Sequence, residues 1–85
     1  MTTSTPLLAL PDLWTSLRRG EVYMHGRVGD ASWVIALPRG QNAVVFQVVL
    51  GETEDRTIVS NYDVFARIVT DALEGEYTVK EHNHA

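Results

Sequence analysis

Apolar residues near the start of the chain recur with the spacing of one helical face. Pro11 suits the first turn of a helix, because its missing N–H would have no intrahelical partner there. Gly20 follows two arginines and is placed for a left-handed helix cap. We therefore predict a helix over residues 11–19. Its apolar stripe consists of Leu10, Leu13, Trp14 and Leu17.

Two segments that follow, residues 22–28 and 31–37, alternate between apolar and polar positions as half-buried strands do. The Gly29-Asp30 pair between them is typical of a type II′ hairpin, in which glycine comes first in a two-residue loop. This loop sets the register, because residues whose numbers sum to 59 then face each other. The predicted pairs are Met24 with Ile35, Val22 with Leu37 and Gly26 with Trp33.

Residues 43–50 are apolar on both sides of a predicted third strand. Strands of this kind usually lie in the middle of a sheet or are covered on both faces. We expect an acidic turn over residues 51–55 and a short strand over residues 56–59. The third strand has Val44, Phe46, Val48 and Leu50 on one side and Ala43, Val45, Gln47 and Val49 on the other.

A second helix is predicted from its start signal and its apolar face. Ser60 is expected to cap the helix, with Asp63 completing a capping box, and Gly75 is expected to end it. A short final strand is predicted over residues 76–81. The resulting fold class is α+β, an antiparallel β-meander of three to four strands with two helices on one face, in the order α-β-β-β-(β)-α-β. We expect a single domain over residues 10–81, with flexible tails at 1–9 and 82–85.

This order of elements resembles that of the double-stranded RNA-binding domain. That family has a lysine pair at the start of its second helix, where this chain has residues 60–63, Ser-Asn-Tyr-Asp. The order is also similar to that of small helix–meander–helix domains that act as chaperones and bind proteins. Because one fold serves many functions, these resemblances concern topology alone.

Composition and charge narrow the possible partners. The chain has 85 residues, no cysteine and a net charge of −4. Four arginines and three acidic residues give residues 1–40 a net charge of +1, whereas three basic and eight acidic residues give residues 41–85 a net charge of −5. A chain without cysteine has no disulfide framework, thiol nucleophile or cysteine-ligated metal. We expect neither nucleic acid nor a membrane as partner, because the chain has no run of basic residues.

The sequence also bears on location. The first apolar run, residues 7–10, is cut by Pro11, and no basic residue precedes Arg18, so neither a membrane span nor a secretory signal is indicated. We expect the protein in the cytoplasm, or in the host cytoplasm if a phage encodes it.

No residue pattern predicts a catalytic or metal centre. His25 lies in the middle of a strand with no acidic partner or nucleophile in the pattern, which favours a half-exposed histidine over a proton-transfer residue. His82 and His84 form an H-x-H, but a metal site needs about four ligands on a rigid frame. The G-x-x-G of residues 26–29 is explained by the hairpin. We therefore predict a protein that is not an enzyme and uses no cofactor or metal.

The side of the sheet away from the predicted core carries apolar residues beyond those that the core requires. If both helices cover the other side, this face meets water, and exposed apolar patches of a few hundred Å² usually mark association sites. We predict a small module that binds a protein partner, or a second copy of itself, through this face. The predicted contact residues are Tyr23, His25, Arg27, Val34, Val45, Gln47 and Val49.

Two alternatives remain open from the sequence. In one, the first helix covers this second face and leaves no free surface. In the other, the protein is an acidic inhibitor of the kind that phages use, which mimics nucleic acid or blocks a basic groove of a host protein. Its carboxylates would have to cluster, and the candidates are Glu52, Glu54, Asp55, Asp63, Asp71 and Glu74.

Overall fold

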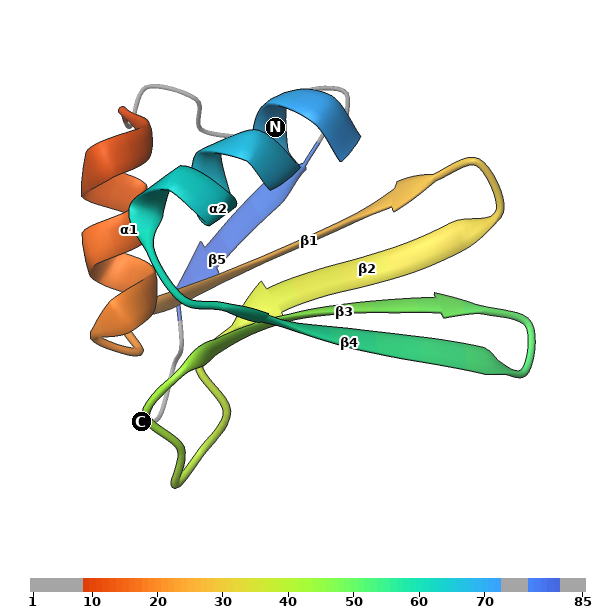
Figure 1. Ribbon diagram of the computed structural model, residues 1–85, viewed down its shortest axis with the longest axis horizontal. Helices are drawn as coiled ribbons and strands as arrows, with labels where there is room; N and C mark the ends of the chain where they lie inside the picture. Colours follow the sequence, from red (N-terminus) through yellow and green to blue (C-terminus); the bar gives the residue numbers. More distant parts are fainter. Residues whose placement is uncertain (1–8, 73–76, 82–85) are drawn as a thin grey trace.

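The computed structural model describes residues 9–72 and 77–81 as two helical segments packed on a five-stranded sheet (Figure 1). A π-helical turn, η1, continues the second helix directly. The elements are α1 Leu10–Arg18, β1 Val22–Val28, β2 Ala31–Ala36, β3 Val44–Leu50, β4 Thr53–Val59, α2 Tyr62–Arg67, η1 Ile68–Ala72 and β5 Thr78–Glu81.

The sheet is antiparallel throughout and has the order β4-β3-β2-β1-β5. The predicted α+β fold and order of elements are therefore confirmed. The first four strands form a meander, and β5 returns to pair with β1 at the far edge. This arrangement makes β1, β2 and β3 the interior strands, while β4 and β5 form the two edges.

The first hairpin has the predicted register. Met24 faces Ile35 and Gly26 faces Trp33. Gly29 has a φ of 61°, which a glycine adopts without the steric cost of a side chain. The predicted pairing of Val22 with residue 37 is not part of this ladder, because β2 ends at Ala36 and Val22 pairs with β5 instead.

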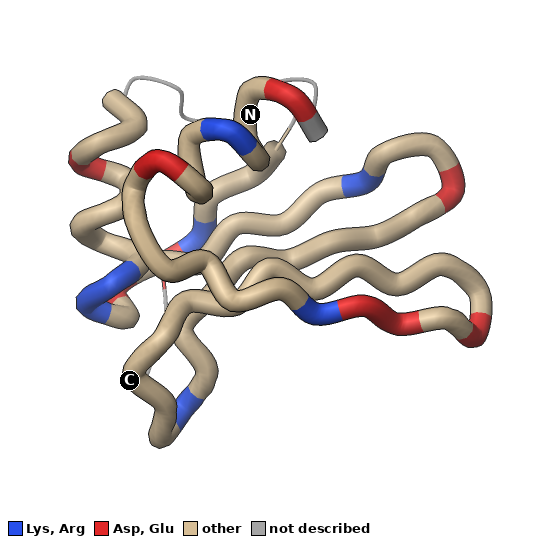
Figure 2. The backbone as a smooth tube through the Cα atoms, in the orientation of Figure 1, with Lys and Arg blue, Asp and Glu red and all other residues tan. Residues whose placement is uncertain are grey.

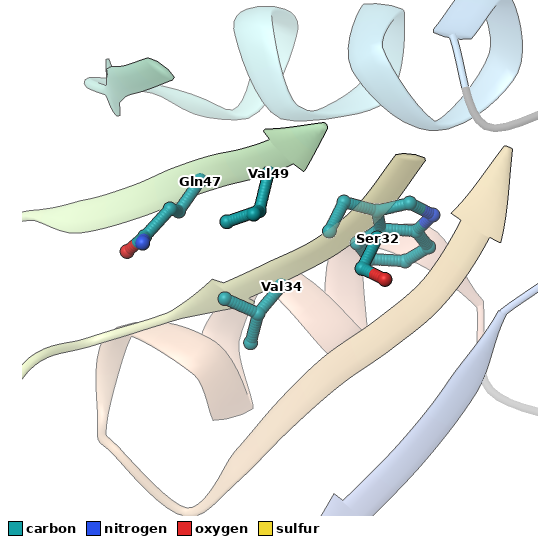
Figure 3. Close-up of a pocket in the computed structure, with 5 residues that line it drawn as sticks. Ser32, Val34, Gln47 and Val49 are labelled. Atoms are coloured by element: carbon teal, nitrogen blue, oxygen red, sulfur yellow. The ribbon is translucent and has the colours of Figure 1, made fainter. Parts of the chain in front are cut away.

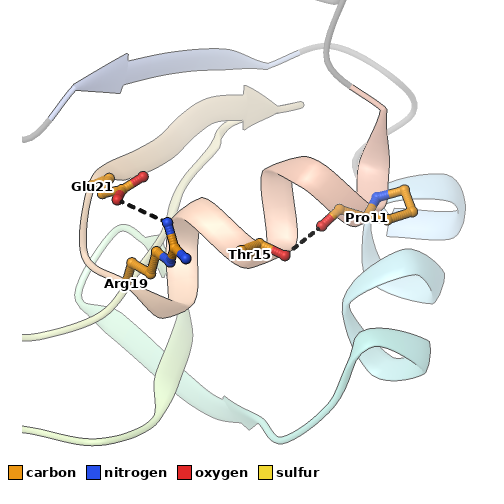
Figure 4. A network of polar contacts seen from close by, with 4 residues as sticks. All are labelled: Pro11, Thr15, Arg19 and Glu21. Carbon is orange, nitrogen blue, oxygen red and sulfur yellow. Dashed lines mark hydrogen bonds and ion pairs between the residues drawn. The ribbon is translucent and has the colours of Figure 1, made fainter.

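Helix α1 ends where the sequence places its cap. Gly20 has a φ of 74°, and its N–H donates to the carbonyl oxygen of Leu17 over 3.0 Å. The residues on either side of Gly20 form an exposed ion pair, with Arg19 Nη1 3.6 Å from Glu21 Oε2 (Figure 4). Inside the helix, the Thr15 hydroxyl donates to the carbonyl oxygen of Pro11 over 3.1 Å.

Both helices pack on one face of the sheet, which we call the inward face (Figure 1). The Trp14 ring of α1 stacks on the Phe65 ring of α2, with centroids 5.3 Å apart. The alternative in which the first helix covers the opposite face is therefore wrong. Trp33 is buried in the same core, and its Nε1 has no hydrogen-bond acceptor among the residues described, a cost that packing must offset. The fully buried side chains are Leu13, Leu17, Met24, Ile35, Val59 and Phe65.

Two local predictions need correction. Asn61, not Ser60, caps the second helix: its side-chain oxygen accepts from the Val64 N–H over 3.0 Å. The turn after β3 consists of two residues rather than five, because Gly51 takes a φ of 62° and lets the strand turn back at once. Glu54 and Asp55 consequently belong to β4, whose exposed position at the sheet edge tolerates charged side chains.

Several predictions fall on parts of the chain outside the described residues. These are the tails at 1–8 and 82–85, including His82 and His84, and the helix end at Gly75. The final strand starts at Thr78 rather than at residue 76.

Candidate interaction surface

The pleat of the sheet brings the seven predicted contact residues together on the face opposite the helices, which we call the outward face. Successive side chains of a strand point to opposite faces. Because Met24 and Ile35 belong to the core, their neighbours along β1 and β2 point away from it. The register then places His25, Val34, Gln47 and Arg56 in one row across four strands. A second row contains Arg27, Ser32, Val49 and Glu54.

Exposure differs strongly among the apolar residues of this face. Val49 is 36% exposed, whereas Val45 is only 7% exposed although it lies outside the core cluster. Val45 faces Ala36 on one side and Ile58 on the other, so it adds little contact area itself. Ile58 is 57% exposed. The exposed apolar area of the outward face therefore belongs mainly to Val49 and Ile58.

Ile58 is the residue of this face that the sequence reading missed. It follows Glu54 and Arg56 at intervals of two, so all three side chains lie on the outward face of β4. This alternation in the sequence already indicated that the three side chains share a face. The predicted strand over residues 56–59 contained Ile58, but its pairing with Val45 is what places it on this face.

A shallow depression of about 140 Å³ lies on the outward face between β2 and β3 (Figure 3). Pockets that bind drug-sized molecules hold roughly 300–1,000 Å³ and enclose most of the ligand. A depression of this size suits a single inserted side chain. It is lined by Ser32, Trp33, Val34, Gln47 and Val49.

Polar groups border these apolar residues. Gln47 Nε2 donates a hydrogen bond to Glu54 Oε2. The rings of Tyr23 and His25 stack with centroids 5.9 Å apart and an interplanar angle of 29°. The row of Gln47 and Arg56 runs between Val49 and Ile58, so the outward face interleaves exposed aliphatic carbon with hydrogen-bonding groups.

The acidic residues of the described chain lie in separate places (Figure 2). Glu54 and Asp55 lie in the first half of β4, beside the turn that contains Glu52, whereas Asp63 belongs to α2, beyond the other end of that strand. A strand rises about 3.3 Å per residue, so the five steps from Glu54 to the end of β4 at Val59 span about 16 Å. Arg56 and Arg67 lie among them. This separation gives little support to an acidic surface that copies nucleic acid.

The described residues contain no group of three or more His, Asp or Glu side chains placed to hold a metal ion. Within the same residues, no helix has the length and apolar character required to cross a membrane. Comparison of the chain with protein-family models, curated proteins and solved structures found no match. The properties of the surface itself therefore carry the functional argument.

Proposed function

We propose that this protein is a small non-enzymatic module that binds another protein through the outward face of its sheet. One observation carries this proposal: Val49 and Ile58 are 36% and 57% exposed on a face that neither helix covers. Burying such aliphatic surface contributes about 25 cal/mol per Å² removed from water. The gain is available only if a partner covers the face.

The shape of the face favours a protein over a small ligand. Its depression of about 140 Å³ is well below the roughly 300–1,000 Å³ of pockets that enclose drug-sized ligands. Protein interfaces use a different design, with an apolar centre and a polar rim. Here Val34 and Val49 form the apolar centre, and Arg27, Gln47 and Arg56 supply hydrogen-bonding groups around it.

The test uses two substitutions in neighbouring positions of β3 that point to opposite faces. Val49→Lys places a cation on the outward face directly across from Glu54, where an opposite-charge pair supports the strand pairing. Leu50→Lys introduces the same side chain on the inward side of the hairpin end, at a residue that is 52% exposed. Both sites are exposed enough to accept lysine without unfolding the domain.

The measurement compares the proteins retained from cells of the source organism by the immobilised wild type and by each variant. We expect a partner that is retained by the wild type and by Leu50→Lys and is lost with Val49→Lys. The thermal unfolding midpoints should confirm that both variants are folded. Equal retention by all three proteins, or equal loss with both variants, would refute the outward face as the contact surface. Retention that disappears steeply as salt is added would instead favour the acidic inhibitor.

A further inference from the structure

We propose that the chain also forms a homodimer by antiparallel pairing of β4 with β4 of a second copy, about a two-fold axis at Asp55. Strand β4 is an edge of the sheet over seven residues, Thr53–Val59, and all except Val59 are exposed. An exposed edge presents unpaired N–H and C=O groups, which form a template for another strand. This inference concerns the sheet edge and does not depend on the proposed contact face.

The two edges of the sheet differ in how well they are protected. Proteins limit edge pairing with short strands, prolines, bulges and charged side chains, lysine above all. The β5 edge is four residues long and carries Lys80. The β4 edge contains no proline, glycine or lysine, and it pairs with β3 without a bulge over seven consecutive positions. Its charged residues Glu54, Asp55 and Arg56 include both signs, so they oppose pairing only in registers that bring like charges together. The β4 edge is therefore the one suited to strand addition.

Backbone geometry determines which N–H and C=O groups of β4 point to the free edge. Leu50 and Thr53 face each other across a two-residue turn. Residues that flank such a turn exchange both hydrogen bonds, and bonded and non-bonded pairs then alternate along the ladder. Every second residue of β4 consequently directs its N–H and C=O to the free edge. These residues are Glu54, Arg56 and Ile58, whose side chains also lie on the outward face.

Charge then selects the register. A two-fold axis perpendicular to the sheet keeps outward residues opposite outward residues, so it must pass through a residue of β4. With the axis at Asp55, Glu54 of each copy faces Arg56 of the other copy, and the pair occurs twice. An axis at Glu54 places the two Glu54 carboxylates opposite each other and leaves Arg56 opposite Glu52, which lies in the turn and not in β4. An axis at Arg56 places the two arginines opposite each other, and an axis at Thr57 pairs Arg56 with Ile58. Directly opposed unlike charges stabilise a strand pair and like charges destabilise it.

The remaining positions fit this register at two costs, the first being that Ile58 of each copy faces the turn residue Glu52 of the other. Thr53 of each copy faces Thr57 of the other, a pair of β-branched residues suited to strands. The two Asp55 side chains meet at the axis on the inward side, where their charges repel. Two attractive charge pairs therefore oppose one repulsive pair. Asp55 limits the strength of the dimer rather than preventing it.

The surroundings leave room for the second copy near Asp55. Figure 1 shows the Thr53 end of β4 projecting away from both helices. The loop over residues 37–43 lies near the other end of the strand, where β3 begins. Pairing centred on Asp55 uses the open end. It also joins the two outward faces into one continuous sheet surface.

A single strand edge offers less area than the roughly 1,200 Å² of a stable standard interface, so the dimer should be weak, with a Kd of about 10–100 μM. Sedimentation equilibrium from about 1 μM to about 1 mM protein spans this range. We expect the wild type to shift from the 9.5 kDa mass of one chain toward twice that mass.

Four variants test the register. Arg56→Glu turns both unlike pairs into like pairs and should raise Kd about tenfold or more. The double variant Glu54→Arg/Arg56→Glu recreates the unlike pairs and should restore Kd to within about threefold of the wild type. Arg67→Glu makes the same change of net charge at an exposed residue of α2, outside the sheet, and serves as the control with unchanged Kd. Asp55→Asn removes the repulsion at the axis and should lower Kd.

A wild type that stays a single chain at about 1 mM overturns the proposal. So does a dimer that Arg56→Glu leaves intact or that the double variant fails to restore, because another surface then holds it. None of these results bears on the proposed contact face, which is tested by the Val49→Lys and Leu50→Lys pair.

Discussion

Phe65 is the side chain whose alteration should reveal how the two helices depend on each other. It is 0% exposed, and its ring stacks on Trp14 at 5.3 Å and lies 6.3 Å from the Tyr62 ring. Phe65→Leu keeps an apolar group in the site and removes the aromatic contacts. Each aromatic pair contributes about 0.5–1.5 kcal/mol beyond burial, and the imperfect fit of leucine adds roughly 1 kcal/mol. Taking both aromatic pairs at their lower limit, we expect Phe65→Leu to lower the free energy of unfolding by at least about 2 kcal/mol.

This loss is large for so small a domain. At about 0.05–0.15 kcal/mol per residue, the whole chain should be stable by roughly 4–13 kcal/mol. A change of 1 kcal/mol shifts the Tm of a domain of this size by about 4–8 °C, so Phe65→Leu should lower Tm by roughly 8–16 °C. The truncation Phe65→Ala should cost about 3–5 kcal/mol and is less suitable, because it approaches the lower limit of the total stability.

Urea denaturation followed by far-ultraviolet circular dichroism measures the change. This signal does not depend on Trp14, which is itself replaced in a second variant. A double-mutant cycle of Phe65→Leu with Trp14→Leu isolates the contact between α1 and α2. We expect a coupling free energy of about 0.5–1.5 kcal/mol. Ile58→Val, at a 57% exposed position, is the matched control and should change stability by less than about 0.5 kcal/mol. A coupling free energy indistinguishable from zero would refute the joint packing of the helices on the inward face.

Two further predictions concern local backbone signals. Asn61→Ala removes the oxygen that accepts from the Val64 N–H and should lower the free energy of unfolding by about 1 kcal/mol, whereas Ser60→Ala should lower it by less than about 0.5 kcal/mol. Thermal unfolding of both variants measures the difference. A lower midpoint for Ser60→Ala than for Asn61→Ala would show that Ser60 is the cap. Gly29→Ala should cost about 1–2 kcal/mol because Gly29 has a φ of 61°, and Gly29→Asn should cost less because asparagine tolerates this conformation. The added Cβ at residue 29 has no other atom within 4 Å, so a loss measured by thermal unfolding reports backbone strain rather than a clash, and an unchanged midpoint would contradict that strain.

The elements that were predictable depend on interactions between residues close in sequence. The hairpin register follows from the two-residue loop at Gly29, because a tight turn leaves only one way for the flanking residues to pair. The end of α1 at Gly20 is equally local, since one residue must take a positive φ there. The alternation along β1, β2 and β3 also determined which side chains share the outward face.

Where local signals were ambiguous, the sequence reading was incorrect. Ser60 and Asn61 are both good capping residues, and the choice depends on where β4 ends and on the direction in which α2 leaves it. Glu54 and Asp55 suggested a turn because charged residues are common in turns. They occupy an edge strand instead, where pairing with β3 satisfies one side of the backbone and water surrounds the side chains.

The sequence by itself thus determined the order of elements, the first hairpin and the shared face of the seven predicted contact residues, but not that Ile58 belongs to the same face. Only the tertiary structure decided that α1 joins α2 on the inward face, because its apolar stripe fits either side of the sheet until Phe65 provides a partner for Trp14. The tertiary structure also gives Val45 and Val49 different exposed fractions, 7% and 36%. Both are valines with the same orientation, and exposure depends on neighbours that the other strands contribute.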